Sequence, residues 1–241
     1  MFQEYVSTAR PVDTFNSDTD ETLLHFAALG GKRETMDRLV SAHVHDINAK
    51  TKTGWTPLLY ALLPKIKGRH NNPSGRRTLH AAIRAAKLLL SYGANPLITT
   101  AQGWTPLHVL SLHIDEFPDG EAEALTHELI SLGCSINPPP ALAIAGKWHA
   151  MSEHIRYPQD RWQKLPLLHW AALHGAVDVV KALIESGANV FEQDMYNHTA
   201  KEVAESSEFL REHVHGGGPF KELGSVGKMI LEVLDEARWR R

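Results

Sequence analysis

Apolar side chains recur at helical spacing over much of the chain, with short polar segments between them. The stretch 177–187 is the clearest example, because Val179, Val180, Leu183 and Ile184 fall on one side of a helix and Gly187 ends the pattern. A stripe at this spacing predicts an amphipathic helix, and a glycine directly after it is typical of a left-handed helix end. Residues 225–239 show a similar stripe and predict another amphipathic helix.

A shorter apolar motif occurs four times. It reads TLLHFAA at 22–28, TPLLYAL at 56–62, TPLHVLS at 105–111 and PLLHWAA at 166–172, and a weaker copy starts at Thr199. A threonine before a helix can accept a hydrogen bond from an otherwise unpaired amide, and proline is tolerated at the first helical position. Each motif therefore predicts a short helix, and the longer amphipathic segments that follow make the repeating unit a pair of helices.

These motifs resemble those of the ankyrin repeat family, whose units carry the pattern T-P-L-H-x-A and recur with a period of about 33 residues. The motif starts at 22 and 56 are separated by one such period, and so are those at 166 and 199. The resemblance implies that the motif histidines, His25, His108 and His169, bond to neighbouring backbone. It also implies that a partner protein is held by the tips of the turns and by the exposed ends of the first helices.

Two intervals depart from this period. The starts at 56 and 105 are separated by one and a half periods, which places an insertion at 64–76, between the two helices of the second unit. The interval from Gly133 to Gly187 is longer than one period and shorter than two, so either one degenerate repeat has lost residues or one repeat has gained about 21 residues. An echo of the first-helix motif at 140–146 favours the degenerate repeat, and residues 151–164 have no usable pattern.

The predicted fold is all-α. It is an ankyrin-like helical-repeat solenoid of about five to six helix pairs, one of them degenerate, closed by a C-terminal capping helix. Residues 1–20 are expected to form an N-terminal cap or to be partly disordered, and residues 21–215 to form the repeat array, with the insertion at 64–76 and an irregular region at 138–164. Residues 216–241 are expected to form a linker and the capping helix.

Composition narrows the class of function. The chain is 43% hydrophobic and 22% charged, which is typical of a folded protein, and its net charge of −3 gives no general attraction to nucleic acid or anionic lipid. The single cysteine, Cys134, cannot form an intramolecular disulfide and fits a reducing compartment, so an intracellular protein of the cytoplasm or nucleus is expected. No stretch approaches the roughly 18 apolar residues that cross a membrane.

The resemblance to ankyrin repeats implies partner-binding roles for particular residues. The residue before the helix cap is Trp55, Trp104 or His198, and two tryptophans at one repeat position are the strongest site signal. Tryptophan is enriched among binding hot spots, although each ring could instead pack on its own turn. The other candidates are turn-tip and helix-end residues: Lys52, Leu63, Leu112, His113, Leu173, His174, Met195 and Tyr196.

Charge is unevenly distributed along the chain. Seven Lys or Arg residues and no acid lie between 64 and 87, whereas six acids and no Lys or Arg lie between 112 and 137. One interpretation is that these segments pair with each other or are simply solvated. The other is that the basic insertion binds an acidic or phosphorylated segment of a partner, because arginine offers paired donors to such anions. The candidate contacts are Lys65, Lys67, Arg69, Arg76 and Arg77.

Motifs of common enzymes and metal sites are absent from the sequence. It has no phosphate-binding glycine loop with lysine, no G-x-S-x-G elbow and no H-E-x-x-H helix, so no catalytic residue, cofactor or metal is predicted. The predicted function is a protein–protein interaction module, acting as a scaffold, adaptor or inhibitor. The alternative is an enzyme or small-molecule binder with a pocket in region 138–164, where His149, His154, Tyr157 and Arg161 supply polar groups.

Overall fold

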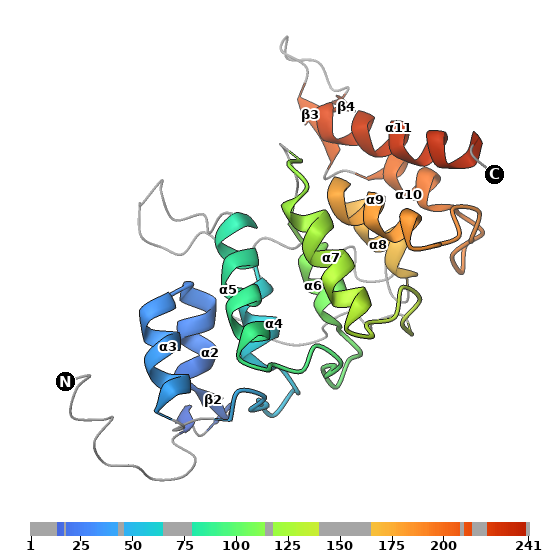
Figure 1. Cartoon of the computed structure of the whole chain (residues 1–241). Helices are drawn as coiled ribbons and strands as arrows, with labels where there is room; N and C mark the ends of the chain where they lie inside the picture. The colour runs from blue at the N-terminus through green and yellow to red at the C-terminus, as the bar shows by residue number, and fades with distance from the viewer. Residues whose placement is uncertain are drawn as a thin grey trace. The chain divides into compact units, whose positions relative to one another are not determined.

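The computed structural model describes residues 14–16, 18–42, 46–64, 79–113, 118–139, 165–207, 210–213 and 221–239. These residues are mostly helical, and the chain divides into two compact units, Met1–Ala101 and Gln102–Arg241 (Figure 1). The predicted insertion at 64–76 and almost all of the irregular region at 138–164 lie outside the described residues.

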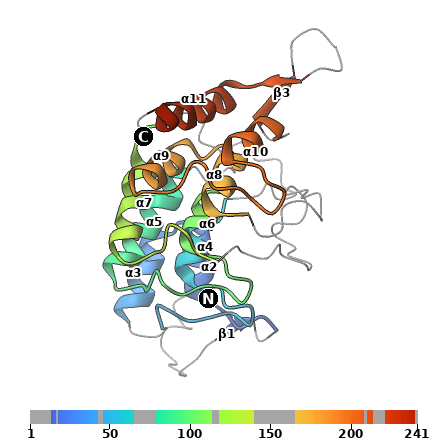
Figure 2. The ribbon, with the colours of Figure 1, turned by 90° about the vertical axis from the view of Figure 1, so that its right-hand side faces the viewer.

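Unit 1 is built from two pairs of helices. The elements are β1 (Thr14–Asn16), β2 (Glu21–Thr22), α2 (Leu23–Gly30), α3 (Arg33–Ser41), α4 (Pro57–Leu62) and α5 (Leu79–Ser91). Helix α2 packs against α3 and α4, and α4 packs against α5. Figure 2 shows the two first helices, α2 and α4, on one side of the unit and the two second helices, α3 and α5, on the other. The apolar stripes of the four helices face one another and form the core of the unit.

The first helices begin and end as the motif predicts. Thr56 has extended backbone, and its hydroxyl accepts a hydrogen bond from the Leu59 amide at the start of α4, where Pro57 takes the first helical position. Helix α2 ends at Gly31, whose φ of 62° is left-handed and which allows the chain to turn directly into α3.

A tight turn precedes α4 and requires glycine. Gly54 has a φ of +84°, and its amide donates to the Thr51 carbonyl oxygen at 2.8 Å. A Cβ at this position would lie 3.0 Å from the Ala101 amide nitrogen and 3.1 Å from Thr100 Cα, which are backbone atoms of the next turn along the chain. Both the dihedral angle and the close approach of two backbones therefore exclude a larger residue.

Unit 2 continues the alternation of short and longer helices. Its elements are α6 (Pro106–Leu110), α7 (Glu121–Ser131), α8 (Leu167–His174), α9 (Val177–Glu185), α10 (Ala200–Ser206), β3 (Arg211–His213), β4 (Lys221–Leu223) and α11 (Ser225–Trp239). The short helices α6, α8 and α10 contact one another in sequence order, α7 packs on α9, and α11 covers α9 and α10.

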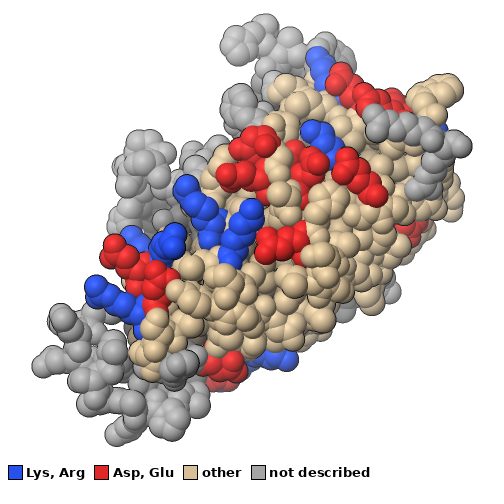
Figure 3. Space-filling model, in the orientation of Figure 1, with Lys and Arg blue, Asp and Glu red and all other residues tan. Residues whose placement is uncertain are grey.

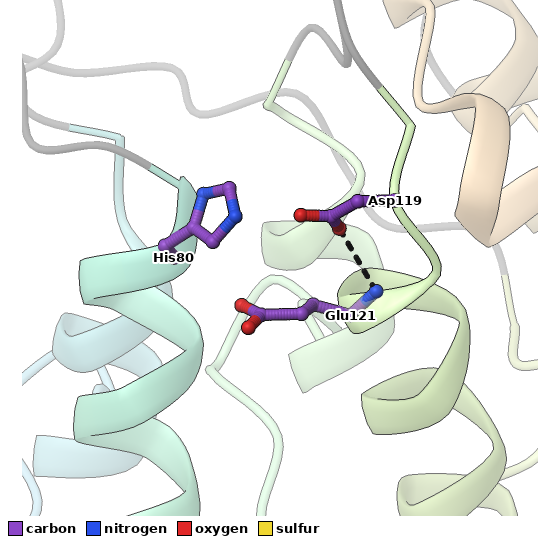
Figure 4. Close-up of side chains that lie close together, drawn as sticks. All are labelled: His80, Asp119 and Glu121. Atoms are coloured by element: carbon purple, nitrogen blue, oxygen red, sulfur yellow. Dashed lines mark hydrogen bonds between the residues drawn. The ribbon is translucent and has the colours of Figure 1, made fainter.

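The start of α7 is tied to α9. The Gly120 amide donates to the carboxylate of Asp178, a buried residue in the first turn of α9, at 2.8 Å. Asp119 accepts a hydrogen bond from the Glu121 amide at 3.0 Å, as the dashed line in Figure 4 shows. These two bonds satisfy amides at a helix start that have no partner within the helix.

The packing of α7 on α9 corrects the interpretation of the long interval between them. The sequence favoured a degenerate repeat within 138–164, but α6 contacts α8 and α7 contacts α9 directly, so the two helix pairs are neighbours. A complete helix pair stacked between them would separate these helices. The alternative that the spacing left open, one repeat that has gained extra residues, agrees with the contacts.

Two further expectations concern the ends of the array. The amphipathic helix expected at 225–239 is present, because α11 spans Ser225–Trp239 and buries Val226, Ile230, Leu234 and Ala237. The all-α prediction is incomplete, because β1 pairs with β2 and β3 pairs with β4 in two short antiparallel ladders. Such short strands carry no periodic signal that the sequence could reveal.

Candidate protein-binding surface

Two of the motif histidines, His25 and His169, join one motif to the next through backbone hydrogen bonds. In α2, the Thr22 amide donates to His25 Nδ1 at 3.1 Å, so the ring proton is on Nε2. That nitrogen lies 3.0 Å from the Trp55 carbonyl oxygen, 30 residues further along the chain, and donates to it. One neutral imidazole thus caps its own helix and fixes the turn before the next one.

The same bond recurs in unit 2. His169 Nε2 lies 2.9 Å from the His198 carbonyl oxygen, 29 residues further along the chain. The cap position of this motif is Pro166, which has neither an amide hydrogen nor a hydroxyl, and the buried His169 Nδ1 has no hydrogen-bond partner among the described residues. The histidine roles implied by the resemblance are therefore confirmed for His25 and His169.

The turn that carries the His198 carbonyl is held in one shape by the buried Asp194. Oδ1 of Asp194 accepts hydrogen bonds from the amides of Tyr196 at 2.8 Å and His198 at 2.9 Å. The Asp194 amide donates to the His198 carbonyl oxygen at 2.8 Å, and Asn197 at the tip has a left-handed φ of 64°. Because these bonds fix the backbone, the side chains at the tip project from a defined frame.

Large apolar groups project from this turn into solvent. Met195 is 64% exposed, and Phe191 and Tyr196 are each nearly half exposed. The guanidinium carbon of Arg238, near the end of α11, lies 5.5 Å from the centre of the Phe191 ring, which is within the range of a cation–π contact. We call Phe191, Met195, Tyr196 and His198 the turn surface.

A comparison with protein families identifies the repeat that carries part of this surface. The family model for the ankyrin repeat matches residues 165–195, which include α8, α9 and the first part of the turn. The chain contains an ankyrin repeat. Ankyrin repeats are generally protein–protein interaction modules. No helix among the described residues has the length and apolar character needed to span a membrane.

The expectation that the two tryptophans face water is wrong. Trp55 is 0% exposed and Trp104 is 2% exposed. The Trp55 ring meets Tyr60 edge-on with centroids 6.3 Å apart, and the Trp104 ring meets Trp170 edge-on at 5.2 Å. These edge-to-face contacts place both indoles in the cores of their units, which is the alternative that the sequence left open.

The helix-end candidates are buried as well. Leu63, Leu112, His113, Leu173 and His174 all lie in the interior, because the first helices are short and the residues at their ends still face the core. Among the predicted partner contacts that the structure describes, Lys52, Met195, Tyr196 and His198 are exposed. The anion contacts Lys65, Lys67, Arg69, Arg76 and Arg77, and the residues of the alternative pocket, lie outside the described residues.

Two exposed aromatic residues were missed. Phe191 and Trp239 are large apolar side chains on the surface of unit 2, but neither occupies a position in the repeated motif. Phe191 follows the last helical stripe by a few residues, and an apolar residue between a helix-ending glycine and the next cap is the signal that could have found it.

Burial governs the protonation of the interior histidines. Desolvation lowers the pKa of His174 from 6.5 to about 4, although the hydrogen bond from its Nδ1 to the Trp170 carbonyl oxygen, at 2.9 Å, acts in the opposite direction. Desolvation also lowers the pKa of His108 to about 4. Both rings are therefore neutral near pH 7, and they serve the packing of unit 2 rather than a charged site.

Proposed function

We propose that the chain is a protein–protein interaction module in which ankyrin repeats are stacked as a solenoid and the turn surface of unit 2 contacts the partner protein. The observation that carries the proposal is a set of exposed apolar side chains on one loop. Met195 and Tyr196 lie on a turn whose backbone Asp194 fixes, and Phe191 precedes that turn. Exposure of several large apolar groups to water is unfavourable, whereas their burial against a partner protein is favourable.

The recurring histidine bonds support the stacked arrangement. His25 to Trp55 and His169 to His198 span 30 and 29 residues, close to the repeat period of about 33 residues. On this proposal the helix pairs α2 and α3, α4 and α5, α6 and α7, and α8 and α9 are successive repeats. Helix α10 begins a further one, and α11 takes the place of its second helix.

The role of a scaffold, adaptor or inhibitor follows from this mode of binding, because the turn surface offers apolar contact area and no catalytic group. Lys52, exposed at a turn tip of unit 1, is a second expected contact. The partner is expected in the cytoplasm or nucleus, where the single cysteine, Cys134, stays reduced.

Site-directed photo-crosslinking tests the proposal. A benzophenone amino acid placed at Tyr196 is expected to form crosslinks to a partner in the source cells, and the same probe at Leu132 serves as the control. Leu132 is also a half-exposed apolar residue of unit 2, but it lies at the end of α7. Equal crosslinking from both positions, or none from Tyr196, would contradict a role for the turn surface.

A double substitution gives an independent measure. Met195→Ser with Tyr196→Ser should abolish capture of whichever partner the crosslink identifies, while Leu132→Ser should leave it unchanged. Neither change removes a buried group, so both variants should keep the wild-type circular dichroism spectrum.

A further inference from the structure

Two carboxylates and an imidazole converge on the outer side of unit 2. Glu123 and His127 lie one helical turn apart on α7, and Glu185 lies at the end of the neighbouring helix α9. One ligand atom from each of the three side chains lies within 4.8 Å of the other two. Figure 3 shows acidic side chains gathered on the part of the surface that α7 and α9 form.

We propose that Glu123, His127 and Glu185 form a zinc-binding site that links α7 to α9. Imidazole nitrogen and carboxylate oxygen are both ligands of zinc, at bond lengths of about 2.1 Å. Two such donors at a tetrahedral angle lie about 3.4 Å apart. His127 Nε2 and Glu185 Oε2 are separated by 3.2 Å, so the pair already has the spacing of two ligands of one ion.

The third ligand, Glu123, comes from the same helix as His127. Glu123 precedes His127 by four residues, a spacing that places both side chains on the same face of a helix. The side chains of His127 and Glu185 are 42% and 59% exposed, so the rings and carboxylates are free to reorient around an ion and to leave water in the fourth position.

The local charge also suits a divalent cation. Two of the three proposed ligands, Glu123 and Glu185, are carboxylates, which attract a cation. The nearest cation on α9, Lys181, has its ammonium group 3.8 Å from the carboxylate of the buried Asp178, and so it balances a different acid. Without metal, His127 and Glu185 make only a solvent-exposed pair of the kind that contributes little to stability.

A bound ion would have a defined structural effect. Helices α7 and α9 belong to adjacent helix pairs that are separated in sequence by the extra residues of the long interval. Zinc would join the outer helices on either side of that insertion and stabilise their contact. The binding would not depend on the turn surface, because none of its four residues takes part.

Zinc titration of the metal-free full-length chain tests this site. With a competing chromophoric chelator, His127→Ala and Glu185→Gln are each expected to lower zinc affinity tenfold or more, because each removes a ligand. Glu128→Gln, which changes a carboxylate of α7 that is not one of the three proposed ligands, is the matched control and should bind as the wild type does. In the wild type, zinc should also shift the one imidazole NMR signal that His127→Ala removes.

The opposite results would overturn the proposal. If His127→Ala and Glu185→Gln bind zinc with the wild-type stoichiometry and affinity, or if zinc leaves the His127 signal in place, the cluster is a surface ion pair. Circular dichroism of the variants separates loss of a ligand from loss of fold, and failure here would leave the proposed turn surface untouched.

Discussion

A single proline interrupts the cap that threonine and histidine form in two other motifs, Thr22 with His25 and Thr105 with His108. At the cap of α8, Pro166 leaves His169 Nδ1 without the amide and hydroxyl partners that Thr22 gives to His25. The backbone of Pro166, with φ −56° and ψ 152°, is nearest among the caps to that of Thr199, with φ −77° and ψ 165°, so a threonine can take the same place.

Replacing this proline therefore tests the cap. Pro166→Thr should be more stable than Pro166→Ala by about 1 kcal/mol, because both variants restore the amide hydrogen but only threonine adds the hydroxyl. Comparison of the two variants removes the effect of proline on the unfolded chain. Urea denaturation measures the difference, and equal stabilities would show that His169 does not use the cap.

The buried tryptophans make a second test at the residue scale. Trp104→Ala should lower the free energy of unfolding by about 3–5 kcal/mol, because it empties a large volume beside the Trp170 ring. Tyr196→Ala, which truncates an exposed aromatic ring, should change stability by about 0.5 kcal/mol or less. Chemical denaturation of both variants distinguishes a core indole from a surface contact, and a stable, folded Trp104→Ala would contradict the burial.

At the residue scale, the sequence predicted the side-chain roles that depend on residues nearby in the chain. Threonine and proline in the motif act on groups a few residues away, so their roles follow from spacing alone. The bonds of His25 and His169 to carbonyls 30 and 29 residues away were instead implied by the resemblance. The burial of Trp104 could not be predicted in the same way, because it depends on Trp170, an aromatic side chain of the next motif. A hot-spot residue type indicates a large contact area but does not say whether a partner or the core supplies it.

At the scale of elements, the amphipathic stripes identified α9 and α11 because their period is that of a helix. The number of helix pairs between α7 and α8 was misjudged for a physical reason. The interval from Gly133 to Gly187 measures chain length, whereas stacking depends on which faces meet, and α7 meets α9. The turn surface was partly predicted through Met195, Tyr196 and His198, but Phe191 lies outside the motif.

Helix α11 offers a prediction about what holds an element in place. Ile230 is fully buried in α11, which packs on α9 and α10, so Ile230→Ala should lower the free energy of unfolding by about 2–5 kcal/mol. Lys201 of α10 donates to both carboxylate oxygens of Asp235 at 2.7 and 2.8 Å, but this pair is partly exposed. Asp235→Ala should therefore cost about 1 kcal/mol or less. Thermal or urea unfolding ranks the two, and the reverse order would mean that charge rather than packing holds α11.

At the scale of the whole molecule, buried neutral histidines link stability to pH. His174 and His108 have folded-state pKa values of about 4, against 6.5 for an exposed histidine. Between pH 4 and pH 6.5 the unfolded chain binds more protons than the folded chain. The free energy of unfolding therefore rises with pH in this range and falls as the solution is acidified. Each of these two histidines can lower the free energy of unfolding by about 3 kcal/mol in acid, since a difference of one pKa unit corresponds to 1.36 kcal/mol.

The free energy of unfolding is accordingly expected to fall steeply between pH 6.5 and pH 4. His174→Gln should flatten this dependence by about one bound proton, although it also loses stability at pH 7 through the altered contact with the Trp170 carbonyl oxygen. Urea denaturation at a series of pH values gives the slope directly. A wild-type slope that stays near zero down to pH 5 would mean that both rings accept a proton without unfolding, which their burial should prevent because a charged imidazole in the core loses its hydration.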